Sequence, residues 1–104
     1  MRSITDYRGI AIRLTDERLE HMVSNHPDVS EHVADIDLVL GDPDIVVQSI
    51  DDEAAHLYYR AIDLADFGGV QMCVVAVVLS SSPFVLTAYF TDRIKQGIEI
   101  WRRK

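Results

Sequence analysis

The chain has 104 residues and a formal net charge of −7, with apolar (48%) and charged (26%) fractions that are ordinary for a globular domain. This length allows one domain, 1–104. The single cysteine excludes an internal disulfide, and no apolar run approaches the ~20 residues of a membrane helix. The first residues, MRSITDYR, lack the apolar run of a signal peptide, so we expect a cytoplasmic protein without a membrane partner.

The charges are unevenly distributed along the chain. Between Asp16 and Asp66 there are fourteen acidic and two basic residues, whereas five basic and two acidic residues follow Asp66. The negative total argues against tight, non-specific binding to nucleic acid. The acidic middle is either a solvated face or a surface for a protein partner. The basic C-terminal end either contacts an anion or is a solvated tail.

The first half of the chain predicts one strand and two helices after a loosely held arm at residues 1–9. Alternating apolar residues predict a short strand over 10–14. Thr15 is a good N-cap for a helix that ends before Pro27, because proline disfavours helical angles in the residue that precedes it. Apolar residues at helical spacing then predict a second helix over about 28–40.

The second half predicts strands separated by short turns. Four strands are expected, over residues 45–50, 56–62, 70–79 and 84–90, with one of the turns at 66–69. The third strand is apolar on both faces, so we expect it at the centre of the sheet. Strands joined by turns this short form an antiparallel meander. The predicted fold class is therefore α+β: a short N-terminal strand and two amphipathic helices packed on a four-stranded antiparallel sheet.

Arg60 and two hydroxyls on the last predicted strand are the first candidates for chemistry. Period-two alternation puts Val85, Thr87 and Tyr89 on one face of their strand, and it puts Arg60 on the same face as Tyr58 in another. A guanidinium within a sheet needs an anionic or carbonyl partner, and its planar donors suit a phosphate. One interpretation joins Arg60 with the two strand hydroxyls in a ligand groove. The other gives Arg60 a salt bridge to a carboxylate and leaves the hydroxyls on a solvated face.

Two histidines of the first predicted helix and one lysine are further candidates. Either His21 or His26 can act as a base near neutral pH. They are five residues apart, ~140° around the helix, which is a poor spacing for joint metal ligation. Otherwise, His26 is a hydrogen-bonded residue at the helix end and His21 is an ordinary exposed histidine. Lys95, after the last strand, is either a phosphate contact or simply exposed.

Several sequence motifs of nucleotide and metal sites are absent. The chain has no GxxxxGKS/T, GxGxxG, CxxC or HExxH segment. We therefore expect no cofactor and no bound metal. Cys73 lies within the longest apolar run and is expected to be a small core residue.

Six short segments, taken in order, resemble a known pattern. They are LTDERLEHM (14–22), NHP (25–27), DPD (42–44), LYYR (57–60), LTAY (86–89) and IKQG (94–97). The chain resembles the small, phage- or mobile-element-linked domains grouped with the barnase, EndoU, colicin E5/D and RelE-like (BECR) nucleases. The resemblance covers the chain from about Ile10 to Trp101, and the order of helices before a four-stranded antiparallel sheet fits that group.

This resemblance implies metal-independent RNA cleavage, as in a toxin or a phage-associated ribonuclease. A base would deprotonate the ribose 2′-hydroxyl, which attacks the adjacent phosphate. An acid would protonate the leaving 5′-oxygen, and a cation would stabilise the charged transition state. The implied partner is RNA, with tRNA as one candidate.

The roles implied by the resemblance fall on residues already singled out. These are His21, His26, Arg60, Thr87 and Tyr89 as catalytic residues, and Tyr58 and Lys95 as substrate contacts. One of the histidines would be the base or acid, and the arginine would hold the phosphate. The two strand hydroxyls would bind or orient that phosphate.

The alternative expectation is a non-catalytic interaction module. It would bind a protein partner, such as an inhibitor, through its acidic helical face. The two expectations differ in geometry. Convergence of Arg60, Tyr89 and a helix histidine in one cleft favours the enzyme, whereas Arg60 paired with a carboxylate, far from both histidines, favours the module.

Overall fold

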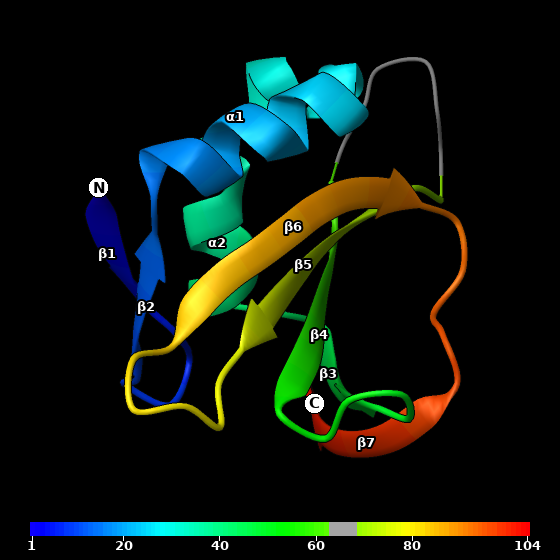
Figure 1. Ribbon diagram of the computed structural model, residues 1–104. Helices are drawn as coiled ribbons and strands as arrows, with labels where there is room; N and C mark the ends of the chain where they lie inside the picture. The colour runs from blue at the N-terminus through cyan, green and yellow to red at the C-terminus, as the bar shows by residue number, and fades with distance from the viewer. Residues whose placement is uncertain (63–68) are drawn as a thin grey trace.

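The computed structural model describes residues 1–62 and 69–104 of the chain (Figure 1). Its elements, in chain order, are β1 (Arg2–Thr5), β2 (Ala11–Leu14), α1 (Asp16–Asn25), the 3-10 helix η1 (Pro27–His32), α2 (Asp35–Gly41), β3 (Ile45–Ser49), β4 (Ala55–Ala61), β5 (Gln71–Val77), β6 (Phe84–Thr91) and β7 (Gly97–Arg102). The turn expected at 66–69 lies mostly outside the described residues.

The strands form one mixed sheet in the order β1-β2-β6-β5-β4-β3-β7. The antiparallel meander from β3 to β6 is confirmed, and β5 lies at the centre, as its apolar faces predict. β2 pairs with β6 in parallel at one position, where Arg13 is opposite Phe84. Beyond that position α1 packs along β6 (Figure 1).

The predicted α+β class is confirmed, but the predicted sheet is too small, because both ends of the described chain add strands. Residues expected to form a loose arm pair with β2 as β1, and Ile4 is buried in the core. β7 pairs with β3 and brings Trp101 against Tyr7. β1 buries one residue and β7 buries none fully, so neither strand shows the strong alternation that sequence patterns detect.

The first helix begins and ends where predicted. The Thr15 hydroxyl caps α1 by accepting a hydrogen bond from the backbone N–H of Arg18 at 3.2 Å. At the other end the N–H of His26 donates to the Met22 carbonyl, and Pro27 then begins η1. This short, capped helix fixes His26 at its C-terminal boundary.

The second predicted helix is wrong as a single element, because η1 and α2 replace it. Neither piece begins with a side-chain capping bond. At the break, His32 Nδ1 lies 2.9 Å from the Asp35 carboxylate. Each piece still buries an apolar anchor completely, Val29 in η1 and Ile36 in α2.

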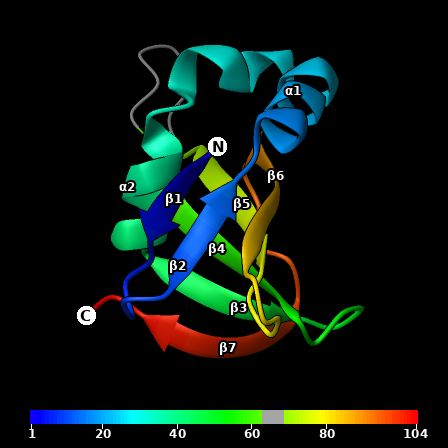
Figure 2. The same ribbon diagram turned by 60° about the vertical axis from the view of Figure 1, so that its left-hand side comes forward.

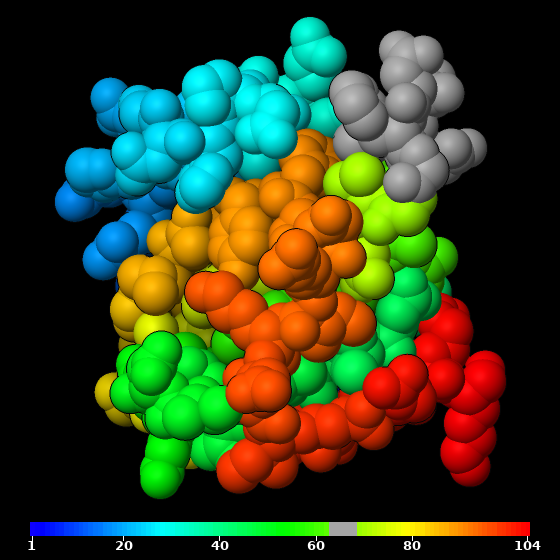
Figure 3. Space-filling view, turned by 90° about the vertical axis from the view of Figure 1, so that its right-hand side faces the viewer, coloured from blue at the N-terminus to red at the C-terminus, as the bar shows by residue number. Residues whose placement is uncertain are grey.

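The sheet separates two apolar clusters. The helices cover one face, as Figure 2 shows for α1 and α2, and the main core lies beneath them. The opposite face carries a smaller cluster, which consists of Ile45, Val47, Leu57, Tyr59 and Cys73. Register shifts between β3 and β7 and between β5 and β6 mark bulges, which increase the bending of a sheet. The sheet curls strongly, so that the connection from β6 to β7 crosses its open side (Figures 1 and 3).

Candidate functional site

Strand register decides which of the predicted residues meet. Tyr89 pairs with Cys73 and Cys73 pairs with Tyr59, so these three side chains lie on the face away from the helices. Arg60 pairs with Met72, which belongs to the helix-covered core. Arg60 is therefore on the opposite face, and the predicted groove that joins Arg60 with the two strand hydroxyls is wrong.

Thr87 and Tyr89 nevertheless line a groove on the face away from the helices. The groove is lined by Ser49, Ile50, Asp51, Leu57, Val75, Leu86, Thr87, Tyr89, Lys95 and Gln96. Leu57, Val75 and Leu86 come from the strands, Ile50 and Asp51 from the connection between β3 and β4, and Lys95 and Gln96 from the connection between β6 and β7. Three of the seven residues expected at a site therefore share this groove.

A bulge changes which β6 side chains face the groove. Ala76 pairs with Val85 while Val75 pairs with Thr87, so Leu86 is the extra residue in β6. Val85 is consequently buried in the main core and Leu86 lines the groove. The alternation predicted from the sequence puts both on the wrong face, although it is correct for Thr87.

Residues 92–96, which we call the β6–β7 strap, bring Lys95 to the groove. The backbone N–H of Lys95 donates to the Tyr59 hydroxyl oxygen at 3.0 Å. The Lys95 ammonium nitrogen lies 6.0 Å from the centroid of the Tyr89 ring, at the outer limit of a cation–π contact. Because the Lys95 side chain is exposed, its charge is available to an anion that enters the groove.

Beneath the groove, Tyr59 and Cys73 lie beside Tyr89. Burial raises the pKa of Tyr59 to about 12 and the pKa of Cys73 to about 11, and it also raises the pKa of Tyr89. All three groups therefore stay protonated at neutral pH. The Tyr89 hydroxyl is buried without a hydrogen-bond partner among the described residues, so this neutral group keeps unused hydrogen-bonding capacity.

The two helix histidines have different surroundings. His26 is half-buried at the C-cap of α1, and its ring centroid lies 5.7 Å from that of Tyr89. His21 is exposed, with its Nε2 4.0 Å from the Glu17 carboxylate. Of the two, His26 is the histidine that contacts a groove residue.

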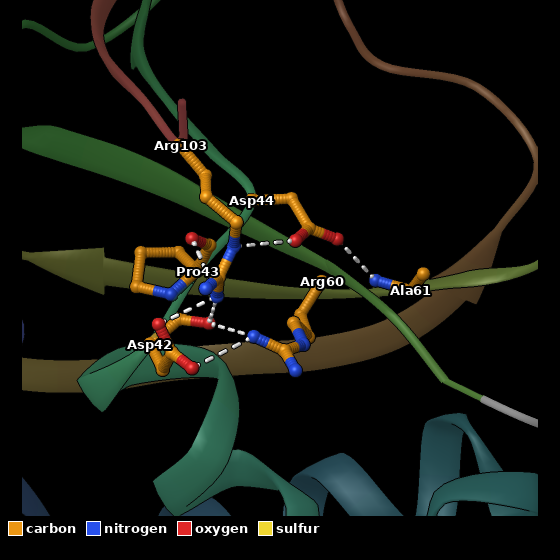
Figure 4. Close-up of polar contacts among 6 residues, drawn as sticks. All are labelled: Asp42, Pro43, Asp44, Arg60, Ala61 and Arg103. Atoms are coloured by element: carbon orange, nitrogen blue, oxygen red, sulfur yellow. Dashed lines mark hydrogen bonds and ion pairs between the residues drawn. The ribbon is translucent and has the colours of Figure 1, made fainter.

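Arg60 belongs to a clasp at the start of β3, which also includes Asp42, Asp44 and Arg103 (Figure 4). Arg60 Nη1 donates to the Asp42 carbonyl oxygen at 2.7 Å and to its carboxylate at 3.0 Å. Arg103 donates to the same carbonyl at 2.7 Å and to the Asp44 carboxylate at 3.1 Å. Hydrogen bonds from Arg103 first, and then from Arg60, hold the pKa of Asp42 below its usual value. The pairing of Arg60 with a carboxylate is one of the two features expected of the interaction module.

Tyr58 cannot reach solvent. Its side chain is fully buried and its hydroxyl donates to the Asp6 carboxylate at 2.8 Å. The same carboxylate accepts the backbone N–H groups of Arg8 and Ile10, each at 2.9 Å. Tyr58 thus anchors the β1–β2 connection to the core, and the predicted substrate contact at this residue is wrong.

Tyr59 is the residue near the groove that the sequence reasoning missed. The signal was available in part, since alternation places Tyr59 on the face of β4 opposite Arg60. The sequence does not show in which register β4 pairs with β5 and β5 pairs with β6. That register alone puts Tyr59 on the same face as Tyr89.

Among residues 1–62 and 69–104, no three His, Cys, Asp or Glu side chains gather in a way that could hold a metal ion. None of the helices in the described part of the chain has the length and apolarity that a bilayer crossing requires. Comparison with known proteins found no matching family model, no similar curated protein and no matching solved structure.

Proposed function

We propose that the chain is a metal-independent endoribonuclease whose substrate phosphate binds in the groove beside Lys95. The observation that carries this proposal is the gathering of Thr87, Tyr89 and Lys95 in one groove, with His26 against the Tyr89 ring. A cation, a hydroxyl donor and a titratable imidazole are the group types that 2′-hydroxyl attack on a phosphodiester needs.

The proposed division of roles follows the positions of these groups. Lys95 stabilises the negative charge that develops on the phosphate, since its ammonium group is exposed at the groove. The Thr87 hydroxyl orients the phosphate. His26 is either the base that takes the 2′-hydroxyl proton as that oxygen bonds to phosphorus, or the acid that protonates the 5′-oxygen as its bond to phosphorus breaks, and water takes the other role. Arg60 takes no part, because the Asp42 clasp occupies it.

The negative net charge of the chain limits how strongly RNA would bind. With a net charge of −7, attraction has to come from a local positive group rather than from the whole surface. The groove combines Lys95 with Asp51 and an apolar wall. We therefore expect weak binding in which few phosphates are contacted, and a shallow dependence of affinity on salt concentration.

The experiment incubates RNA with the purified protein and a chelator across about pH 5 to 8, and identifies the ends produced. The proposal predicts fragments with 2′,3′-cyclic phosphate ends. His26→Ala should lower the cleavage rate by about 10²-fold, as expected for loss of an acid–base group. His21→Ala is the matched control on the same helix. Loss of cleavage in His21→Ala but not in His26→Ala would contradict the role of His26.

A second proposal is a non-catalytic module that binds a basic protein partner through α1 and η1. Two observations favour it: Arg60 is paired with a carboxylate, and the acidic side chains of Asp16 and Glu17 on α1 are 91% and 83% exposed. Charge reversal at Glu17 and Glu20 should then weaken a complex that also weakens in salt. A complex that is indifferent to both changes would contradict this proposal.

A further inference from the structure

We propose that Tyr59 is a positioning residue: its hydroxyl, by accepting the Lys95 backbone N–H, holds the β6–β7 strap so that the Lys95 ammonium lies over Tyr89 at the groove. The hydrogen bond is 3.0 Å long and joins residues 36 positions apart in the chain. The meaning of this inference for catalysis rests on the proposed function, but the position of Lys95 can be measured without any substrate.

The strap depends on few contacts. Its residues are all exposed, and it joins β6 to β7 across the open side of the curled sheet (Figure 3). Two bonds between Thr91 and Arg93 hold its first turn to the end of β6. Among the described residues, one hydrogen bond joins residues 92–96 to a strand other than β6, and it is the bond from the Lys95 N–H to the Tyr59 hydroxyl.

Tyr59 is suited to anchor this strap because its own ring cannot move. The residue is fully buried and packs in the smaller cluster with Ile45, Val47 and Cys73. Its hydroxyl oxygen meets the strap at the Lys95 N–H. A ring fixed by packing gives a fixed acceptor, and a bond to the fourth residue of a five-residue connection restricts where Lys95 can lie.

The expected consequence is pre-organisation of the Lys95 charge. A lysine on a free loop loses more conformational entropy when it binds a phosphate than a lysine that is already held at the groove. Removing the anchor should therefore weaken RNA binding about fivefold, the change that loss of one hydrogen bond of ordinary net strength gives.

The first test compares Tyr59→Phe with Tyr58→Phe by NMR in the absence of RNA. Each change removes one buried hydroxyl from β4, but the two hydroxyls lie on opposite faces of the sheet. In Tyr59→Phe we expect the Lys95 amide to exchange at least about tenfold faster, and the Lys95 side-chain protons to lose their ring-current shift from Tyr89. In Tyr58→Phe both signals should stay. Unchanged Lys95 signals in folded Tyr59→Phe would overturn the inference.

The wild-type protein provides a measurement that needs no variant. The Lys95 amide should exchange more slowly than those of Ile94 and Gln96, whose N–H groups make no hydrogen bond recorded in the described structure. Equal exchange at the three positions would overturn the inference even if Tyr59→Phe failed to fold.

The second test measures binding of a 2′-O-methylated RNA oligonucleotide, which cannot be cleaved by 2′-hydroxyl attack. Tyr59→Phe should bind it about fivefold more weakly than wild type, and binding equal to wild type would contradict a positioning role. If the wild-type protein binds no RNA, the proposed function fails, while the exchange and ring-current signals of Lys95 still decide whether Tyr59 holds the strap.

Discussion

Tyr58 and Tyr59 are neighbours in β4, yet their hydroxyls make hydrogen bonds on opposite faces of the sheet. The Tyr58 hydroxyl donates to the Asp6 carboxylate at 2.8 Å, and the Tyr59 hydroxyl accepts from the Lys95 backbone at 3.0 Å. One tyrosine therefore stabilises the helix-covered core and the other supports the groove. This division predicts different outcomes for substitutions that look alike in the sequence.

Tyr58→Phe should destabilise the fold. It leaves the buried Asp6 carboxylate with one donor fewer, and loss of a hydrogen bond to a buried charged group costs about 1–3 kcal/mol. Urea unfolding monitored by circular dichroism measures this change in the free energy of unfolding. A loss below about 0.5 kcal/mol would show that the bond to Asp6 contributes little.

Stability should fall in mild acid because of His56. This residue is buried, its Nδ1 has no hydrogen-bond partner among the described residues, and burial first, then the charge of Arg8, lowers its pKa below the ordinary 6.5. The unfolded chain therefore binds a proton more readily than the folded one. The contribution of neutral His56 is fully present above about pH 6.5 and is lost as the pH falls towards the lowered pKa.

Unfolding free energies measured at about pH 7.5 and pH 5.5 check this dependence. The wild-type protein should lose more stability between these values than His56→Leu, which has no proton to bind. If both proteins lose the same amount of unfolding free energy, groups other than His56 cause the acid sensitivity.

Gly97→Ala should be destabilising, because a Cβ at this position would collide with the Gln48 carbonyl oxygen and the Val47 side chain. The backbone atom cannot give way, and overpacking of this kind costs about 1–3 kcal/mol. Gly41→Ala is the matched control, since its Cβ would meet the Thr5 carbonyl at an ordinary 3.7 Å. Similar thermal melting of the two variants would argue against close packing of β7 on β3.

Arg60→Ala distinguishes the groove from the site that the sequence predicts. Arg60 lies in the Asp42 clasp on the helix-covered face, so its removal should lower the melting temperature and leave RNA affinity within about twofold of wild type. Binding of an uncleavable RNA oligonucleotide measures this. A large loss of RNA affinity in folded Arg60→Ala would contradict this expectation and indicate that the phosphate binds at Arg60.

Some of this architecture is predictable from the sequence, and the reasons for the errors are physical. Thr15, Pro27 and the apolar strands carry local signals, so α1 and the meander follow from them. The side to which Arg60 points relative to Tyr89 depends on register between strands, and a sequence pattern holds no such information.

The bulge in β6 and the strand at the C-terminal end were missed for a related reason. Leu86 and Val85 exchange faces because β6 has one residue more than β5 at that point. β7 is an exposed edge strand, with Ile98 64% exposed, and its pairing with β3 is a long-range contact. Both features are set by tertiary pairing rather than by local periodicity.

The most direct test of the central claim, that the groove beside Lys95 cleaves RNA, is the cleavage rate of Lys95→Ala beside wild type and Arg93→Ala. Arg93 is the matched control, because it is a cation of the same strap whose side chain is 90% exposed and does not line the groove. We predict metal-independent cleavage by wild type and Arg93→Ala, and a rate about 10²-fold lower in Lys95→Ala. Intact RNA after exposure to wild type, or equal rates in all three proteins, would contradict the claim.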